Sequence, residues 1–379
     1  MTTLADYCEL TMGQAPKGTT YNTMAAGLPL IAGASDLGQI YPAPSRWTSA
    51  PTQICQADDI ILCIRATIGD RNWADRTYCL GRGVAGLRAK PGRIERRYLW
   101  HWLAAATPRL MHAARGATFL QVSRHAIESL PCSPPDSLPE QRRIADILDK
   151  VDAIRRQRKE AMALTENLIR AVFLEIFGDP VTNPKGWDTR PLSRLGRMTT
   201  GNTPSRAVEA YFGNDIEWIK SDNINTPSHY LTRATEGLSA KGRAIGRVVP
   251  AGSSLVTCIA GSPQCIGNVA LADRDVAFNQ QINAITPQPG VDHRFLYALL
   301  LVGKRLVQAA STNSMKGMVS KGRLEKIQVP APPQDVQREF GAVFERLLGM
   351  SQRQEAALLE SELLFASTTQ RLFAREVIA

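Results

Sequence analysis

The sequence predicts an α+β fold built as a tandem duplication, in which two similar globular domains are each followed by one long helix. Three observations support this prediction. Related motifs recur at a separation of about half the chain, the segments around them show strand and helix patterns in the same order, and two long stretches have the apolar periodicity of an extended helix. A length of 379 residues is consistent with two or three domains.

The duplication is clearest in two segments that present the same residue types in the same order. Residues 122–148 are VSRHAIESLPCSPPDSLPEQRRIADIL, and residues 319–344 are VSKGRLEKIQVPAPPQDVQREFGAVF. Each begins with Val-Ser, passes through Pro-Pro and reaches Gln-Arg at the start of a helical pattern. The matched pairs are Ile127 with Leu324, 197 residues apart, and Ile68-Gly69 with Ile266-Gly267 and Tyr98 with Leu296, each 198 residues apart. Because solenoid repeats have roughly 20–50 residues, the repeated unit here is a domain with a helical extension.

Each globular domain is predicted to contain several strands followed by a helix. In the first domain the strands are expected at residues 60–67, 77–80 and 84–90, and the helix at 95–106. In the second domain the strands are expected at residues 254–260, 267–272 and 276–286, and the helix at 292–310.

The two long helices are predicted from residues 137 to 177 and from about 334 to 377. The first stretch contains no glycine, and its one proline, Pro139, lies in the first turn, where proline is tolerated. Apolar residues follow at spacings of three and four in both stretches, Ile154, Leu164 and Met350 among them. The residues expected to pack between the helices are Ile144, Leu148, Val151, Leu168, Val172, Phe340, Leu347, Leu358, Phe365 and Leu372.

The order of domains and helices determines the expected arrangement. The first helix leads from the first domain to the second, so the second helix can pair with it only by running back antiparallel, as a coiled-coil spacer with pseudo-two-fold symmetry. The alternative is that each helix folds back onto its own domain. The expected divisions are residues 1–133 and 179–330 for the domains, and 134–178 and 331–379 for the helical segments.

The net charge of +10 is concentrated in the two domains. Residues 1–133 have 14 Lys and Arg against 9 Asp and Glu, and residues 179–330 have 18 against 11. The helical segments are balanced, with 8 against 8 in residues 134–178, or slightly acidic, with 5 against 7 in residues 331–379. Basic domains with neutral helices favour a polyanionic ligand at the domains.

Polar loops between the predicted strands have the side chains that contact DNA phosphates and base edges. The alternative for each loop residue is a solvated turn. For Asn279, Gln280 and Gln281, which form a polar break within the strand predicted at 276–286, the alternative is a structural role that holds a neighbouring loop. The candidate DNA-binding residues are Lys17, Thr19, Thr20, Tyr21, Arg65, Arg82 and Arg115 in the first domain, and Thr203, Ser205, Arg206, Lys220, Asp222, Asn223, Asn279, Gln280, Gln281, Asn313 and Lys316 in the second.

The central run LPEQRRIADILDKVDAIRRQRKEAMALTENLIRAVFLEIFGDPVTNPKGW resembles the same region of type I restriction-modification specificity subunits. The runs TTGNTPSRAVEAYFGNDIEWIKSDNIN, FNQQINAI and MVSKGRLEKIQVPAPP are similar to landmarks of that family's target recognition domains. The first domain departs from the pattern, with CLGRGVAGLR where the second has FNQQINAI, so the two half-sites are expected to differ.

This resemblance implies two target recognition domains joined by two antiparallel helices, in a subunit that recognises a bipartite, asymmetric site in double-stranded DNA. It implies two copies of a DNA adenine methyltransferase subunit as partners and, in some complexes, a restriction subunit. The subunit itself is expected to be non-catalytic and without a cofactor. S-adenosylmethionine is expected on the modification subunit, and ATP and Mg on the restriction subunit.

Other classes of protein are weighed against this interpretation. The sequence has no GxGxxG, no GxxxxGK[ST] and no Asn/Asp-Pro-Pro-Tyr/Phe motif, and its five histidines show no metal-ligand spacing. The seven cysteines, without CxxC, are expected to be small buried residues in a reducing cytoplasm. The first residues do not resemble a signal peptide, and no segment resembles a membrane span. A helical scaffold or adaptor with two globular domains and no DNA specificity is the alternative function, although it leaves the basic domains unexplained.

Overall fold

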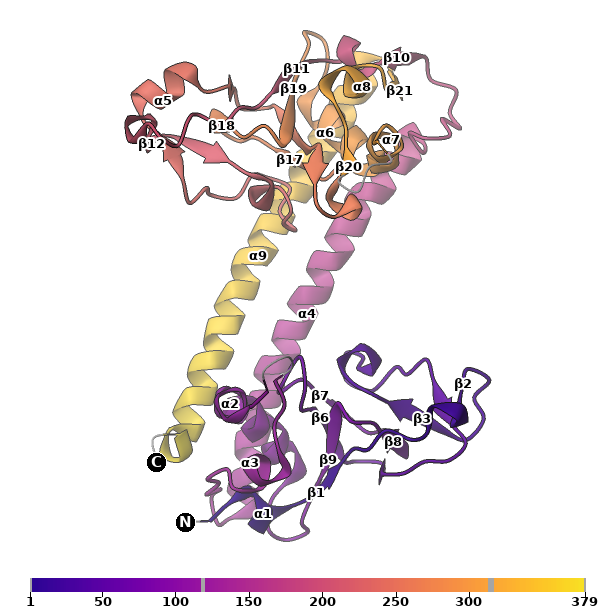
Figure 1. The fold of residues 1–379 in the computed structure, drawn as a ribbon, viewed down its shortest axis with the longest axis vertical. Coiled ribbons are helices and arrows are strands. Elements are labelled where there is room, and N and C mark those ends of the chain that lie inside the picture. The colour runs from indigo at the N-terminus through magenta and orange to yellow at the C-terminus, as the bar shows by residue number, and fades with distance from the viewer. Residues whose placement is uncertain (1, 117–119, 313–316, 378–379) are drawn as a thin grey trace. The chain divides into compact units, whose positions relative to one another are not determined.

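A computed structural model describes residues 2–116, 120–312 and 317–377 of the protein. The chain forms two compact units (Figure 1). Unit 1 comprises residues 1–158 and 357–379, and unit 2 comprises residues 159–356. Within the part of the chain that is described, no helix is both long enough and apolar enough to cross a membrane.

The described residues of unit 1 form two sheets and three short or medium helices besides its share of the long ones. One sheet is antiparallel, in the order β1 (Cys8–Met12), β9 (Val84–Ala89), β6 (Ile60–Cys63) and β7 (Arg71–Trp73). The other has the order β2 (Tyr21–Asn22), β4 (Trp47–Thr48), β3 (Leu28–Ile31), β8 (Tyr78–Leu80) and β5 (Ile54–Cys55), with β3 and β8 parallel. The helices are α1 (Leu4–Tyr7), α2 (Arg96–Ala113) and α3 (Arg124–Glu128).

Unit 2 repeats this plan. Its antiparallel sheet has the order β11 (Gly196–Thr200), β19 (Ile282–Pro287), β15 (Ser254–Thr257) and β17 (Val269–Leu271). Its second sheet has the order β13 (Gly237–Leu238), β12 (Phe212–Ile219), β18 (Val276–Phe278) and β14 (Val248–Val249), with β12 and β18 parallel. Two-stranded pairs join β10 (Thr189–Pro191) to β21 (Gln328–Pro330) and β16 (Ile259–Ala260) to β20 (Gly317–Met318). The helices are α5 (Ala240–Ile245), α6 (His293–Val302), α7 (Lys304–Ala309) and α8 (Lys321–Glu325).

The predicted duplication is confirmed in detail. Ile127 in α3 and Leu324 in α8 are both fully buried, and the helices that contain them are capped by Ser123 and Ser320. Gly69 and Gly267 both have positive φ, the conformation that favours glycine. The pairing of Tyr98 with Leu296 is wrong by one residue. The caps of α2 and α6 align Tyr98 with Phe295 instead, because each donates its backbone N–H to the capping carboxylate.

Three predicted elements of unit 2 are each divided in two. The strand expected at 276–286 is β18 and β19 with a turn at 279–281, and the strand expected at 254–260 is β15 and β16. The helix expected at 292–310 ends at Gly303 and resumes as α7. Sequence patterns miss such breaks because apolar residues continue on both sides of them. In unit 1, α2 extends beyond the expected 106 to Ala113.

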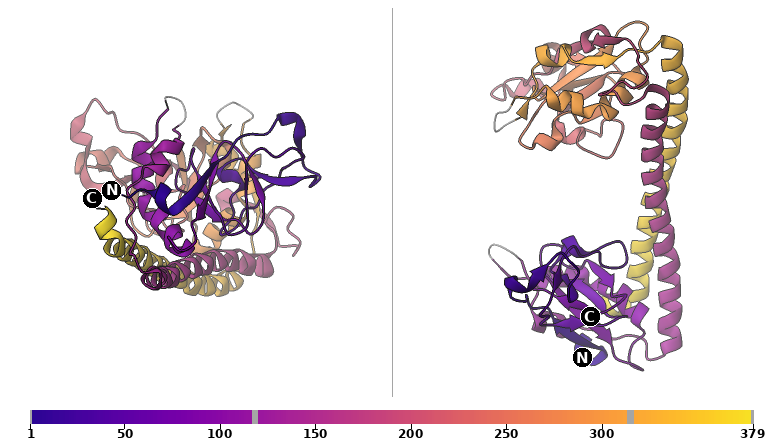
Figure 2. Two further views of the ribbon diagram at one scale, coloured as in Figure 1. Left: turned by 90° about the horizontal axis from the view of Figure 1, so that it is seen from below. Right: turned by 90° about the vertical axis from the view of Figure 1, so that its right-hand side faces the viewer.

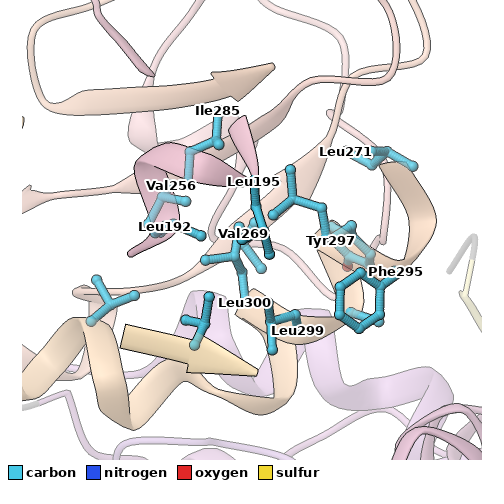
Figure 3. Packing of buried hydrophobic residues seen from close by; sticks show 14 of the residues in the cluster. Leu192, Leu195, Val256, Val269, Leu271, Ile285, Phe295, Tyr297, Leu299 and Leu300 are labelled. Carbon is cyan, nitrogen blue, oxygen red and sulfur yellow. The ribbon is translucent and has the colours of Figure 1, made fainter. Parts of the chain in front are cut away.

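The core of unit 2 lies between its antiparallel sheet and α6. Side chains from β15, β17 and β19 and from the turn at Leu192–Leu195 face Phe295, Tyr297 and the leucines of α6 (Figure 3). Apolar residues occupy most of α6, as expected for a helix covered on several sides. Burial of this kind is the main stabilising contribution to each unit.

The cysteines are largely buried, as expected. All but Cys265, which is half-buried, lie in the interior. Burial raises the pKa of the Cys8 and Cys55 thiols to about 12. Thiols with so high a pKa remain protonated and unreactive at neutral pH, so these residues act as small apolar side chains.

The helices α4 (Leu138–Phe177) and α9 (Gln334–Val377) are each continuous, and within each unit their halves lie side by side (Figures 1 and 2). In unit 2 the ring of Phe177 near the end of α4 lies 5.3 Å from that of Phe340 near the start of α9, and Thr165 hydrogen-bonds Gln354 at 2.9 Å. In unit 1 the Arg155 guanidinium lies 4.7 Å from the centre of the Phe365 ring. The helices are therefore antiparallel in both units.

The predicted packing residues are buried or half-buried with one exception. That exception is Leu168, which is 46% exposed. Leu164, at 68%, and the predicted stripe residues Ile154 and Met350 are exposed as well. The buried seam of α4 in unit 2 instead contains Thr165, Ile169, Phe173 and Phe177. The prediction failed here because a polar residue, Thr165, occupies the seam and leaves the neighbouring leucines outside. The predicted residues that are buried or half-buried are Ile144, Leu148, Val151, Val172, Phe340, Leu347, Leu358, Phe365 and Leu372.

A glutamine fixes the start of each long helix to the globular part of its unit. In unit 1 the buried Gln141 accepts a hydrogen bond from the backbone N of Glu95 at 2.7 Å and donates to the carbonyl O of Pro135 at 2.7 Å. In unit 2 the buried Gln337 accepts from the backbone N of Asp292 at 3.0 Å and donates to Pro332 O at 2.8 Å. This explains why glutamine recurs after Pro-Pro in both segments.

We expect Gln337→Met to lower the stability of unit 2 by about 1–3 kcal/mol, because methionine leaves the Asp292 N–H and the Pro332 carbonyl without their buried partner. Urea denaturation is the measurement. Gln352→Met, an exposed position on the same helix, is the control and is expected to change stability by less than about 0.5 kcal/mol. Equal urea midpoints for the two variants would show that the Gln337 amide does not stabilise the attachment of α9 to unit 2.

Candidate nucleic-acid interface

One turn has the same backbone hydrogen bonds in both units. It joins β8 to β9 at Gly81–Gly83 in unit 1 and β18 to β19 at Asn279–Gln281 in unit 2. Four hydrogen bonds from a backbone N to a backbone O match between the units. In unit 1 they are Gly13 to Val84 (3.0 Å), Gln14 to Leu80 (2.8 Å), Gly81 to Ile31 (2.8 Å) and Ile64 to Gly83 (2.9 Å). Their counterparts in unit 2, in the same order, are Gly201 to Ile282 (3.1 Å), Asn202 to Phe278 (3.1 Å), Asn279 to Ile219 (3.0 Å) and Cys258 to Gln281 (2.8 Å). The loop after the first strand of each antiparallel sheet is thereby held beside the turn.

In unit 1 the predicted residues of the first loop form one short polar segment. Lys17 and Thr19 are exposed. Thr20 donates its hydroxyl to Lys17 O at 2.7 Å and is 2.8 Å from the Thr48 hydroxyl, and the Tyr21 hydroxyl donates to Pro16 O at 3.2 Å. The segment therefore presents Lys17 and Thr19 to solvent, while Thr20 and Tyr21 shape it.

The three predicted arginines of unit 1 have different surroundings. Arg82 is exposed at the tip of the turn. Arg65 lies next to the same turn, because the preceding residue Ile64 donates its backbone N–H to Gly83 O. The Arg65 Nε donates to Gln121 Oε1 at 2.8 Å. Arg115 is exposed and pairs with Gln121 through the backbone, at 3.0 and 2.9 Å. Arg65 and Arg115 therefore meet at Gln121.

In unit 2 the turn itself contains three predicted residues. Asn279 is buried, and its Oδ1 accepts from the backbone N of Gln281 at 3.1 Å while its Nδ2 donates to Gln281 Oε1 at 3.3 Å. The Gln281 carbonyl accepts from Cys258 and Ile259, at 2.8 and 3.1 Å. Gln280 is exposed, and its Oε1 accepts a hydrogen bond from the Thr203 hydroxyl. Asn279 and Gln281 thus hold the turn, and Gln280 projects from it.

Arg206 and Lys220 share an acidic partner. Arg206 lies 2.8 Å from Glu236, and Lys220 also forms an ion pair with it. Both cations lie over the Trp218 ring, at 5.6 and 5.3 Å from its centre. Lys220 first, then Arg206, lower the pKa of Glu236 from its ordinary value. Arg206 and Lys220 therefore form a mainly cationic surface over the Trp218 ring of β12.

The remaining predicted residues of unit 2 divide into exposed and structural positions. Ser205 and Asp222 are exposed. Asn223 is buried, where its Oδ1 accepts from Lys220 N at 3.0 Å and its Nδ2 donates to Arg233 O at 3.1 Å, so it shapes the loop after β12. Asn313 and Lys316 lie outside the described residues.

Three polar neighbours were not among the predicted residues. Gln121 joins the two arginines of unit 1, Glu236 pairs with two cations of unit 2, and Ser221 donates to Gln281 Oε1 at 3.4 Å. Each lies far in sequence from at least one partner, and no local motif signals it. Whether any of the predicted residues contacts DNA stays a prediction.

A hollow of about 800 Å³ in unit 2 does not include any predicted site residue. Among its lining residues are Arg170, Lys304 and Arg305. The Lys304 ammonium donates to Gln264 O at 2.7 Å and Asn268 Oδ1 at 2.5 Å, so it forms part of the wall. Within the described ranges, no group of three or more His, Cys, Asp or Glu side chains could hold a metal ion. The predicted residues that are exposed thus lie on loops outside this hollow.

Comparison with known proteins gives the same family match twice along the chain. The family model for the type I restriction modification DNA specificity domain matches residues 3–163 and residues 184–360. The chain is 30% identical over 171 residues to the type I restriction enzyme MjaX specificity subunit of Methanocaldococcus jannaschii, covering 44% of this chain and 40% of that protein. It is 29% identical over 177 residues to the HindI specificity subunit of Haemophilus influenzae, covering 44% and 38%. The chain therefore matches less than half the length of either relative.

Solved structures with the same fold cover nearly the whole chain. The S subunit of a type I restriction-modification system from M. genitalium has a TM-score of 0.61 at 12% identity, covering 98% of this chain and 94% of that one. A chain from a structure concerned with complex assembly and conformational transition of the type I restriction-modification system has a TM-score of 0.54 at 18% identity, covering 98% and 96%. At these identities the similarity shows the fold alone.

Proposed function

This chain belongs to the family of type I restriction modification DNA specificity domains, and we propose that it is the subunit that recognises DNA sequence in such a system. In this proposal each unit contacts one half of a bipartite site in double-stranded DNA. The observation that supports it is the duplicated turn: one backbone frame is built twice and presents Gly81-Arg82-Gly83 in one unit and Asn279-Gln280-Gln281 in the other. Equal frames with unequal side chains suit an asymmetric site.

The basic surfaces support DNA as the ligand. Arg82, Arg115 and Lys17 are exposed in unit 1, and Arg206 is exposed in unit 2 beside Lys220. Cations on loops attract phosphates without sequence preference, whereas amide and guanidinium groups at base edges distinguish bases. A protein with both kinds of group can bind DNA generally and then select one sequence.

The long helices are proposed to bind two modification subunits. Each helix has a pair of exposed leucines four residues apart, Leu164 and Leu168 on α4 in unit 2, and Leu359 and Leu363 on α9 in unit 1. Residues four apart lie on one helix face, and next to each pair a polar residue, Thr165 or Ser361, is buried instead. Two apolar patches, one on each long helix, support two copies of one partner.

Methyl transfer to adenine is assigned in this proposal to the modification subunits, which would bind S-adenosylmethionine. ATP and Mg would belong to a restriction subunit where one is present. The chain itself would be non-catalytic, would supply sequence recognition and spacing, and would act in the cytoplasm, where the DNA is.

The proposal is tested by selecting duplexes from a randomised pool with the purified chain, alone and with its modification subunit. We expect the bound fraction to be enriched in two short defined segments separated by a constant undefined spacer. We also expect affinity to fall steeply with salt, because several phosphate contacts release counterions. A complex that assembles but enriches no sequence would instead support a scaffold or adaptor.

A further inference from the structure

The duplicated turn places one exposed side chain at the same point in each unit. The hydrogen bonds that align Gly81 with Asn279 and Gly83 with Gln281 leave Arg82 opposite Gln280. Both side chains are exposed at the tip. No other position in the turn is equally open, because residue 279 is buried and residue 281 accepts hydrogen bonds through its backbone and its side chain.

The two turns reach this common form by different means. In unit 1, Gly83 comes so close to the end of β3 that a Cβ there would lie 2.3 Å from Ala32 O, so only glycine fits. In unit 2 the Asn279 side chain braces the turn by accepting from Gln281 N. Both solutions fix the backbone on each side of the tip, which reduces the entropy lost when the tip residue is immobilised on a ligand.

The tip residues differ in their chemistry in a way that matches two bases. A guanidinium donates two parallel hydrogen bonds, which fit O6 and N7 of guanine, whereas an amide accepts one and donates one, which fit N6 and N7 of adenine. The Thr203 hydroxyl donates to Gln280 Oε1 and so orients the amide, with its NH₂ and a second lone pair left for a base. The corresponding loop position in unit 1 is Ala15, and a guanidinium needs no such orientation because all its groups are donors.

We propose that Arg82 and Gln280 are equivalent specificity-determining residues, Arg82 for a guanine in one half-site and Gln280 for an adenine at the matching place in the other. The inference rests on the proposed function and deepens it, because it states which residue in each unit distinguishes the half-sites. The cationic groups of Arg65, Arg206 and Lys220 already donate to acceptors on the protein, whereas the Gln280 NH₂ is not used by Thr203, so these three residues are left to contacts that do not depend on sequence.

The test uses the complex of the full chain with its modification subunits and sequences the duplexes that each variant selects. Arg82→Gln is expected to change one guanine to adenine in one half-site, and Gln280→Arg to make the reverse change in the other. On fixed duplexes the preference for the original base should fall by about 5- to 150-fold, which corresponds to the discrimination of one bidentate contact. Arg82→Lys, which retains the charge but not the planar fork, should weaken the guanine preference and keep most of the affinity.

The control is Arg142→Gln, an exposed arginine on α4, which should leave the selected sequence unchanged. Circular dichroism of every variant checks that it is folded. If Arg82→Gln and Gln280→Arg weaken binding to all duplexes equally and select the original sequence, the inference is overturned while the proposed function stands. If the complex with the unsubstituted chain selects no sequence, the inference and the proposed function both fail.

Discussion

Exchange of residues 1–133 for the corresponding segment of another specificity subunit is expected to change one half of the recognised site and to leave the other half as it was. The reason is that the contacts of the turns lie within one unit in each case. The recognised sequence of the chimera, obtained by duplex selection, is the measurement. A change in both halves would contradict independent recognition by the two units.

The structure indicates how this chimera is best built. Helix α2 in the exchanged segment is attached to the retained helix α4, because Arg97 lies 2.7 Å from Asp146 and 2.9 Å from Asp149, and His101 lies 2.7 Å from Asp149. Burial raises the pKa of Asp149, but hydrogen bonds from His101 and Arg97 outweigh it and hold that pKa below its ordinary value. A donor segment with arginine and histidine at these two positions preserves the attachment. The control is the reciprocal exchange of residues 179–330, which should change only the other half.

The second large effect is expected at the exposed leucines of the helices. The double variant Leu359→Lys with Leu363→Lys should bind one modification subunit instead of two, and so should Leu164→Lys with Leu168→Lys, because a charge in an apolar contact lacks a partner. All four changes together should abolish binding of the modification subunit. Native mass spectrometry of the co-expressed subunits gives the stoichiometry directly.

The control for these variants is Gln352→Lys, an exposed change on α9 that adds a positive charge outside the leucine pairs. Because all of these positions are exposed, the fold should be affected by no more than about 0.5 kcal/mol per change. If every variant still binds two subunits, the leucine pairs are not the docking patches.

Most of the architecture can be predicted from the sequence because the same elements occur twice, with matching residues at equivalent positions. The serines before Ile127 and Leu324 cap α3 and α8, and the glutamines after Pro-Pro hold the starts of α4 and α9, so the repetition of these residues follows from repeated hydrogen bonds. The position of the helical seam was harder to predict. Thr165 is buried and Leu168 is exposed, because hydrogen bonding to Gln354 offsets the cost of burying the hydroxyl. Hydrophobic periodicity contains no information about such a partner.

The candidate site shows the same limit. The polar run at 279–281 is visible in the sequence, but not that Asn279 and Gln281 hold a turn while Gln280 projects from it. The repeat separation of 198 residues does place Arg82 opposite Gln280, although GRG and NQQ share no residue type. The backbone hydrogen bonds between segments distant in sequence confirm that alignment and show that both residues lie at the tip of the turn.

We propose that this chain selects the DNA sequence at which a methyltransferase acts. Methylation-sensitive sequencing of the host genome, with and without the gene for this chain, tests it most directly. We expect a split motif with methylated adenines in two unlike halves, present in the parent strain and lost throughout the genome when the gene is deleted. Retention of every methylated adenine motif in the deletion strain would contradict it.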